Sequence, residues 1–393
     1  MKRRDLIKSG SLAVLGMAAT ACAPRSAAVV TTPARRPMSV LPRIHASWDR
    51  VIRTTVGFRP HRPGGFVLRA DKLGSKLLIH NFGHGGSGMS LSWGTAAMAA
   101  DLALQQGERT VAVIGGGVVG LTTARELQRR GFGVTIYAAA LPPEVTSNWS
   151  LAGFTPTSGL ISGNVRTPEW TAQFQQAVDL AYRRLQLLVG PKYGISWITN
   201  YAPTDDEKMA GGSNVLLPAH IQGARELLQP GEHPFPTRFA IQRPEMRIEP
   251  SIYLEALLED VKIFGASIII RKFEKADEIA ALPQPVIVNC TGLGAKTLFA
   301  DDQLVPLKGQ LTVLVPQPEI EYSTSGGARV QSAEPGLGIH MMPRRDGIIL
   351  GGTSERDVWT PEVNEKERQR IVNGHIELYS AMKGPGAPMP RRG

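Results

Sequence analysis

The chain has 393 residues, of which 42% are hydrophobic, and it carries a formal net charge of +10 at pH 7. This length and composition predict one large globular α/β protein or two ordinary domains, and they exclude a disordered chain. The basic residues are scattered rather than interleaved with aromatic ones, which argues against a nucleic-acid-binding protein. No apolar stretch reaches the length of a membrane-spanning helix.

Residues 1–22 are typical of an export signal. They begin with the basic stretch KRRDLIK, continue into a weakly apolar segment and end in the small residues that precede Cys22. The paired arginines resemble a twin-arginine signal, whose route carries folded, cofactor-loaded proteins. The ending ATAC resembles a lipoprotein cleavage site with Cys22 as the lipidated residue, although leucine is usual at its first position. An unlipidated Cys22 and an ordinary amphipathic N-terminus therefore stay open, and residues 23–41, rich in Ala, Pro and Arg, predict a flexible linker.

A first glycine-rich run follows an apolar strand predicted at 77–80. The run contains four glycines within residues 83–88, which let the backbone approach a ligand closely. A helix is predicted at about 90–106, with Ser90 or Ser92 as its N-cap. A ligand bound there would lie at a helix N-terminus, where anions are stabilised. A glycine-rich connector without a ligand is the alternative.

A second glycine run lies in TVAVIGGGVVGLTTARELQRRGFGVTIYA, which begins at Thr110 and predicts strand, turn, helix and strand. Gly115, Gly117 and Gly120 have the G-x-G-x-x-G spacing of a dinucleotide-binding turn. A carboxylate usually follows the second strand and binds the ribose, but here that strand ends in alanines and the next carboxylate is Glu144. The sequence therefore marks the pyrophosphate site better than the ribose site.

The two cysteines of the chain are too few for a zinc or iron–sulfur site, and no metal is expected. Cys290 ends the continuous apolar run VIVNC, which predicts a buried strand. We therefore expect Cys290 to be a core residue rather than a nucleophile.

Six short motifs, spread over most of residues 42–380, together resemble a known family. They are GFRP with a following RP at residues 57–63, IHNFGHGGSG with WG at 79–94, TSN with AG at 146–153, VIVNCTG at 286–292, LKGQ at 307–310 and ILGGT at 349–353. This set resembles the D-amino-acid oxidase family of FAD-dependent oxidoreductases. The resemblance implies an α/β (mixed α+β) fold in which a Rossmann-like FAD-binding domain carries a sheet-rich substrate domain.

The order of these motifs differs from that of the family. There the nucleotide turn comes first and the GFRP and HGG motifs come last, whereas here those two precede the turn and connect to it through Gly107–Arg109. The resemblance therefore implies a circularly permuted chain, which requires only that the former ends lie close together. The expected boundaries are an export signal at 1–22, a linker at 23–41, substrate-domain segments at 42–76, 161–247 and 301–381, an FAD-binding core at 77–160, its return segment at 248–300 and a tail at 382–393.

The same resemblance implies the residues of the active site. Arg59 would bind the substrate carboxylate with its planar guanidinium, although a salt bridge to a loop acid is the alternative. The carbonyl of Gly86 would accept a hydrogen bond from the substrate amine. His340 and Gly336 replace family contacts; His340 would hydrogen-bond a carboxylate, select an acidic substrate, or be an ordinary strand residue. The implied FAD contacts are Gly85, Gly86, Ser87, Gly88, Met89, Ser90, Gly115, Gly117, Val118, Val119, Gly120, Ala139, Thr146, Ser147, Asn148, Ala152, Gly153 and Phe273.

The implied activity is the oxidative deamination of an amino acid, D-amino acids being favoured, by hydride transfer to flavin. The electron acceptor would be oxygen or a membrane quinone. The expected export signal implies that the protein is located in the periplasm or anchored on the outer side of a membrane, after transport by a twin-arginine-type route. The alternatives are an oxidase of glycine or N-methyl amino acids, a quinone-linked dehydrogenase of the same fold, and a flavin-binding protein without turnover; the HGGSG run argues against a nicotinamide dehydrogenase.

Overall fold

The computed structural model describes residues 37–151, 153–159, 166–211, 214, 216–326 and 338–384. The expected export signal with Cys22 lies outside these residues, as do Ala152, Gly336 and most of the linker and tail. The described end of the linker is bound to the protein, because the Ser39 amide donates to the Glu232 carbonyl at 3.1 Å. Within the described part, no helix is long and apolar enough to cross a membrane.

The first of two sheets has six strands in the order β2-β3-β10-β4-β5-β9. Strand β2 is antiparallel to β3, and the other five are parallel to one another. Strands β4 and β10 are buried along almost their whole length, as expected for parallel strands covered on both faces. The strands are β2 (Val67–Leu73), β3 (Lys76–Phe82), β4 (Thr110–Ile114), β5 (Gly133–Ala138), β9 (Ser267–Ile270) and β10 (Val286–Asn289).

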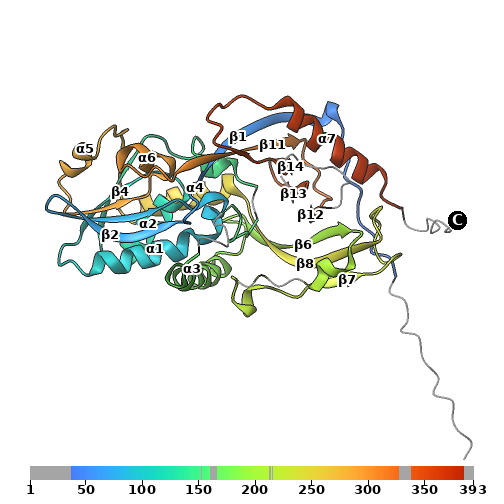
Figure 1. The fold of residues 1–393 in the computed structure, drawn as a ribbon, viewed down its shortest axis with the longest axis horizontal. Coiled ribbons are helices and arrows are strands. Elements are labelled where there is room, and N and C mark those ends of the chain that lie inside the picture. Colours follow the sequence, from blue (N-terminus) through green and yellow to red (C-terminus); the bar gives the residue numbers. More distant parts are fainter. Residues whose placement is uncertain are drawn as a thin grey trace, which may run out of the picture. The chain divides into compact units, whose positions relative to one another are not determined.

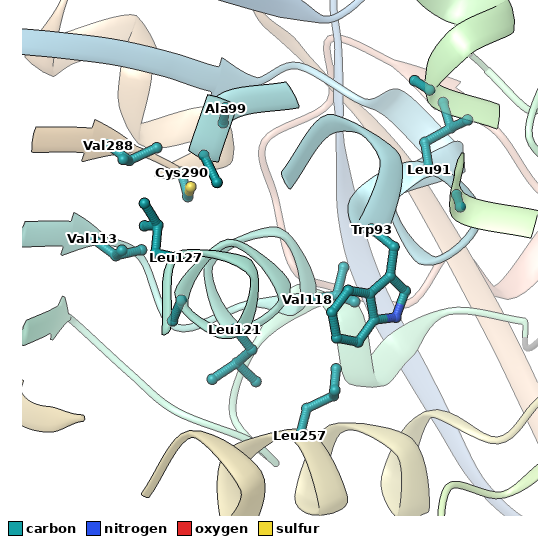
Figure 2. Close-up of a cluster of buried hydrophobic side chains, with 14 of the residues drawn as sticks. Leu91, Trp93, Ala99, Val113, Val118, Leu121, Leu127, Leu257, Val288 and Cys290 are labelled. Carbon is teal, nitrogen blue, oxygen red and sulfur yellow. The ribbon is translucent and has the colours of Figure 1, made fainter. Parts of the chain in front are cut away.

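Helices cover this sheet, and alternate residues of each strand enter the two cores. Val113 and Val288 face Leu127 and the helix that carries Ala99 (Figure 2). Ala112 and its alternates point the other way, into a smaller core. The helices packed on the first core are α1 (Gly88–Leu104), α2 (Val118–Arg129), α3 (Pro168–Leu187) and α4 (Pro250–Ile263), and the short helices on the other side are α5 (Ala276–Ala280) and α6 (Ala295–Leu298).

The second sheet has nine strands in the order β1-β11-β14-β13-β12-β6-β8-β7, with β15 also paired to β11. Neighbours are antiparallel except for β12 and β6, which are parallel. Helix α7 (Glu365–Ser380) packs on β11 and β14 (Figure 1). The strands are β1 (Val51–His61), β6 (Ile195–Thr204), β7 (Glu226–Leu228), β8 (Phe239–Ile248), β11 (Val305–Leu314), β12 (Tyr322–Ser325), β13 (His340–Arg344), β14 (Gly347–Gly351) and β15 (Glu355–Arg356).

Three local expectations differ from the structure. The segment 42–76 does not belong to one domain, because β1 joins the nine-stranded sheet whereas β2 pairs with β3 in the six-stranded one. Helix α3, expected in the substrate domain, packs against α1 instead. Helix α1 begins at Gly88, not near Ser90 or Ser92, because the 3-10 turn Gly85–Ser87 leads directly into it.

Cys290 is a core residue, as expected. It is the free cysteine of the described chain, and burial raises the pKa of its thiol to about 12. A thiol with such a pKa is not a nucleophile near neutral pH.

The contact between α1 and α3 allows a test of the packing. A Cβ added to Gly94 would overlap the backbone carbonyl of Ala177, and no side-chain rotation can relieve that overlap. Alanine in a helix otherwise stabilises by about 1 kcal/mol relative to glycine. We expect Gly94→Ala to lower the free energy of unfolding by about 2 kcal/mol or more, as overpacking does, measured by denaturant titration.

Gly107→Ala is the matched control, since an added Cβ there meets no atom within 4 Å. Its effect should stay within about 0.5 kcal/mol. Equal stability of the two variants would contradict the close helix contact.

Candidate active site

The two glycine runs lie at one edge of the six-stranded sheet. Strand β10 separates β3 from β4, and Asn289 is paired with both His80 and Ile114. Because the three strands are parallel, the loops that follow them emerge at the same edge. Strands β3 and β4 are two strand spacings apart, which is about 9.6 Å. The HGGSG run after β3 and the GGGVVG run after β4 are therefore neighbours in space.

A cavity of about 1120 Å³ follows this edge and continues onto the nine-stranded sheet. At one end it is bordered by residues 271–274, which follow β9, and at the other by Arg59 and His340. This volume exceeds that of pockets for drug-sized molecules. The cavity therefore suits a long ligand together with a second, smaller one.

The turn after β4 requires its glycines for different reasons. Gly115 has φ +125°, and a Cβ there would overlap the carbonyl of Cys290. A Cβ on Gly120 would overlap the carbonyl of Gly115, so Gly120 allows close packing and does not border the cavity. Gly117 borders the cavity and leaves room for a ligand at the N-terminus of α2, where the Val118 amide donates to Ser147 Oγ at 3.1 Å. This turn has the geometry of a pyrophosphate site.

The turn after β3 is held by a buried histidine. His84 Nε2 lies 3.0 Å from Thr95 Oγ1, and its ring stacks on Phe66 with 5.5 Å between centroids. Burial lowers the pKa of His84 to about 4, so the ring is neutral near pH 7. The Gly86 amide donates to the Ser158 carbonyl at 3.0 Å and is therefore already engaged within the protein.

The hydroxyls of Ser87 and Ser90 point behind this turn. Ser87 Oγ donates to the carbonyls of Ser158 at 2.9 Å and Thr155 at 3.3 Å, and Ser90 Oγ accepts from the Thr155 amide at 2.8 Å. Neither residue borders the cavity. They connect the HGGSG turn to residues 155–158 instead of facing a ligand.

Arg59 is fixed on β1 at the other end of the cavity. Its Nε donates to the carbonyl of Leu307 at 3.2 Å and its Nη2 to the carbonyl of Thr353 at 3.0 Å. The guanidinium lies over Gly309, and its Cδ is 3.4 Å from the position of a Cβ on Gly86. Carbonyl acceptors orient a guanidinium, and a planar guanidinium binds a carboxylate through two parallel donors, so Arg59 is well placed to bind a carboxylate.

His340 borders the same end from β13. Its Nε2 lies 2.6 Å from the position of a Cβ on Gly351, so the ring lies against that glycine. Burial, and then the charges of His375, Arg59 and Arg370, lower the pKa of His340 to about 3. A neutral imidazole can hydrogen-bond a substrate but cannot attract an anion by charge.

The adenosine end lacks a carboxylate directly after β5, as the sequence indicates. Glu144 and Glu274 both border this end, and Glu274 forms an ion pair of 2.8 Å with Lys272. The side chain of Phe273 is buried against Tyr137, with 5.8 Å between ring centroids. The two glutamates are therefore the carboxylates that border this end of the cavity in the described chain.

The predicted cofactor residues divide into three groups. Those that border the cavity are Gly85, Gly86, Gly88, Met89, Gly115, Gly117, Val118, Val119, Ala139, Thr146, Ser147, Gly153 and Phe273. Ser87, Ser90, Gly120 and Asn148 lie behind it, and Ala152 falls outside the described residues.

Sequence reasoning missed several residues that border the cavity. Asn81 is fully buried beside the glycine turn, and its Oδ1 lacks a hydrogen-bond partner among the described residues. Asn200, Arg243 and Glu245 lie on strands of the nine-stranded sheet that carry no motif. Alternation along β8 places Ile241, Arg243 and Glu245 on one face, but it does not say which face meets a ligand.

These features fit a flavin dinucleotide. The turn after β4 would hold the pyrophosphate, residues 271–274 the adenosine and the turn after β3 the flavin ring. The buried Oδ1 atom of Asn81, which borders the cavity, is an acceptor without a hydrogen-bond partner among the described residues.

Several known proteins are similar in sequence to this chain. The family described as FAD dependent oxidoreductase matches residues 110–387, beginning at the first residue of β4. D-amino-acid oxidase of Streptomyces coelicolor is 28% identical over 280 residues, covering 70% of this chain and 79% of that protein. D-amino acid oxidase of Dugesia ryukyuensis is 24% identical over 283 residues, covering 70% and 78%. The solved glycine oxidase of Geobacillus kaustophilus is 18% identical with a TM-score of 0.49, covering 69% of this chain and 80% of its own.

The family match spans well over half of the chain. The glycine turn after β4, which borders the cavity, lies at the beginning of the matched residues. The chain belongs to the FAD dependent oxidoreductase family, and its cofactor is FAD.

Proposed function

We propose that this protein is an exported enzyme that oxidatively deaminates an amino acid, in particular a D-amino acid, to a 2-oxo acid. The observation that carries the proposal is the position of Arg59. Its guanidinium is oriented by two carbonyls and borders the same cavity as the Gly86 turn. The names of the curated relatives support an amino-acid substrate.

The residues of the chain would orient the substrate by both of its charged ends. Arg59 would bind the α-carboxylate with two parallel N–H donors. The carbonyl of Gly86 would accept a hydrogen bond from the amine, which must lose its proton before the α-carbon can release a hydride. Bound FAD supplies the ring that accepts the hydride. Water then hydrolyses the imino acid to a 2-oxo acid and ammonia, and oxygen or a quinone takes up the electron pair.

Contacts to the α-carboxylate and the amine do not select the side chain of the substrate. Glycine and N-methyl amino acids carry the same carboxylate, so an oxidase of those substrates and a quinone-linked dehydrogenase are the alternatives within this chemistry. A flavin-binding protein without turnover is the third. Reduction of the bound flavin by a panel of D- and L-amino acids without oxygen separates an enzyme from a protein without turnover.

The proposal includes a circular permutation. Residues before Thr110 precede the family match, yet β3 lies beside β10 and β1 lies beside β11 within the two sheets. This placement supports a family chain whose last segment has moved to the front. We also propose that residues 1–22 direct export by a twin-arginine route, with the protein in the periplasm or anchored through a lipidated Cys22.

Arg59→Ala tests the carboxylate clamp. We expect the variant to bind FAD normally and to lose roughly a hundredfold or more in kcat/KM for its amino acid, because one partner of a charge-assisted pair is removed. Stopped-flow reduction of the flavin measures this. Arg53→Ala is the control, since Arg53 lies on the same strand, pairs with Asp346 and is outside the cavity. Equal rates for both variants would refute the assigned role.

The pH dependence of kcat/KM should not include the titration of His340 or His84. Burial lowers the pKa of His340 to about 3 and that of His84 to about 4, so both rings stay neutral between pH 5 and 8. We expect kcat/KM to rise with pH as the substrate amine loses its proton. The His340→Asn variant should show the same rise, at the same pH, as the wild-type protein. An inflection near pH 6.5 that vanishes in His340→Asn would contradict this expectation.

The export proposal is tested with residues 1–41 fused to a reporter that folds before export. Replacing Arg3 and Arg4 by lysine should retain the reporter inside the cell, because the route depends on the arginine pair. Cys22→Ser should remove only membrane anchoring. Fractionation measures both effects, and export that is independent of the arginines would be a failure of the proposal.

A further inference from the structure

The cavity extends beyond Arg59 onto the strands at the far side of the nine-stranded sheet. Ile241, Arg243 and Glu245 of β8 border it from one face of the strand. Asn200 of β6 is paired directly with Arg243 in the antiparallel ladder and borders it too. This wall contains charged side chains that the proposed carboxylate clamp does not use.

A hydrogen-bond network fixes the position of Arg243. Asn200 is 2% exposed, and its Oδ1 accepts from Arg243 Nε at 3.1 Å and from Ser325 Oγ at 3.0 Å. Asn200 Nδ2 donates to Ser323 Oγ at 2.9 Å, and Ser323 Oγ donates to Glu245 Oε2 at 2.5 Å. The network thereby holds Arg243 through Nε, which leaves the two terminal nitrogens of its guanidinium for another partner.

The charge of Arg243 is the second feature of this wall. Arg243 forms no ion pair with a described carboxylate, and Asn200 is its hydrogen-bond partner in the described chain. Arg225 also borders the cavity, at an exposed position. The buried part of its side chain, and then the charge of Arg243, lower the pKa of Arg225, so the two guanidinium groups repel each other. Glu245 is the carboxylate of this wall among the described residues, and the neutral His340 supplies no charge.

We propose that Arg243, assisted by Arg225, binds a second anionic group of the substrate, so that the preferred substrate is an amino acid with an acidic side chain. This inference rests on the proposed function, in which Arg59 binds the α-carboxylate. A carboxylate placed between the two arginines relieves their repulsion and satisfies the planar donors of Arg243. A neutral side chain would leave a partly buried guanidinium without a charged partner.

Glu245 offers the opposite reading, a substrate with a cationic side chain. It is less suited, because one of its carboxylate oxygens already accepts from Ser323 and two arginines share the wall with it. A purely structural role for Arg243, as a donor to Asn200, is the other alternative. Both are separate outcomes of the experiment.

The experiment compares matched substrates on the FAD-loaded protein. D-glutamate and D-aspartate are paired with D-glutamine and D-asparagine, and D-lysine tests the reading through Glu245. We expect kcat/KM to favour the acidic member of a pair by tenfold or more. Arg243→Gln keeps an amide that can donate to Asn200 but removes the charge. It should reduce kcat/KM for the acidic substrate by roughly tenfold to a hundredfold, mainly through KM, and change the neutral one less than about twofold.

The matched control is Arg183→Gln, on α3. The Arg183 side chain is 71% exposed and pairs with Asp179 one helical turn away, outside the cavity. This variant should leave both substrates of a pair unchanged. An equal loss for acidic and neutral substrates in Arg243→Gln would show a structural role and overturn the proposal, as would a preference for D-lysine.

Binding without turnover gives a second measurement. Glutarate carries two carboxylates and butyrate one, so glutarate should raise the melting temperature of the wild-type holoprotein more than butyrate does. Arg243→Gln should abolish that difference, and Arg243→Lys should restore part of it. If neutral D-amino acids reduce the flavin without any acidic preference, this inference fails while the proposed function stands. If no amino acid reduces the flavin, the proposed function fails.

Discussion

The pairing of β10 with two other strands is the constraint on which the site depends. Asn289 is in register with His80 on one side and Ile114 on the other. This double register brings His80 of β3 level with Ile114, the last residue of β4, so the two glycine turns open toward the same space. A slip of one residue in either pairing would turn every side chain of that strand to the opposite face. The length and continuity of the cavity follow from this register.

The nine-stranded sheet adds polar and charged side chains that could bind a substrate beside the cofactor. Strand β1 presents Arg59 next to the turn that contains Gly86, so a fixed cation lies beside the expected position of the flavin ring. Strands β6 and β8 contribute a polar wall in which one asparagine uses both its acceptor and its donor. Arg59, Asn200 and Arg243 are therefore all carried on strands.

The sequence predicts best what the backbone itself demands. Gly115 and Gly120 are recognisable because overlaps with neighbouring carbonyls allow no other residue there. The motif around Arg59 likewise marks a cation. Ser87 and Ser90 are placed behind the turn by acceptors and donors at residues 155–158, which spacing cannot reveal. Arg243 escaped notice because its face is set by long-range pairing with β6, and such pairing leaves no local pattern.

The strand between the two glycine turns is also the last of the three to be made. Residues 76–120 carry both glycine turns in one continuous stretch, whereas β10 begins only at Val286. Until the ribosome has passed that point, β3 and β4 have no shared neighbour, and their turns are tethered through α1 without being aligned. Capture of FAD must therefore follow the synthesis of most of the chain. Alignment of the two glycine turns therefore requires a four-residue strand that lies far behind both of them in the chain.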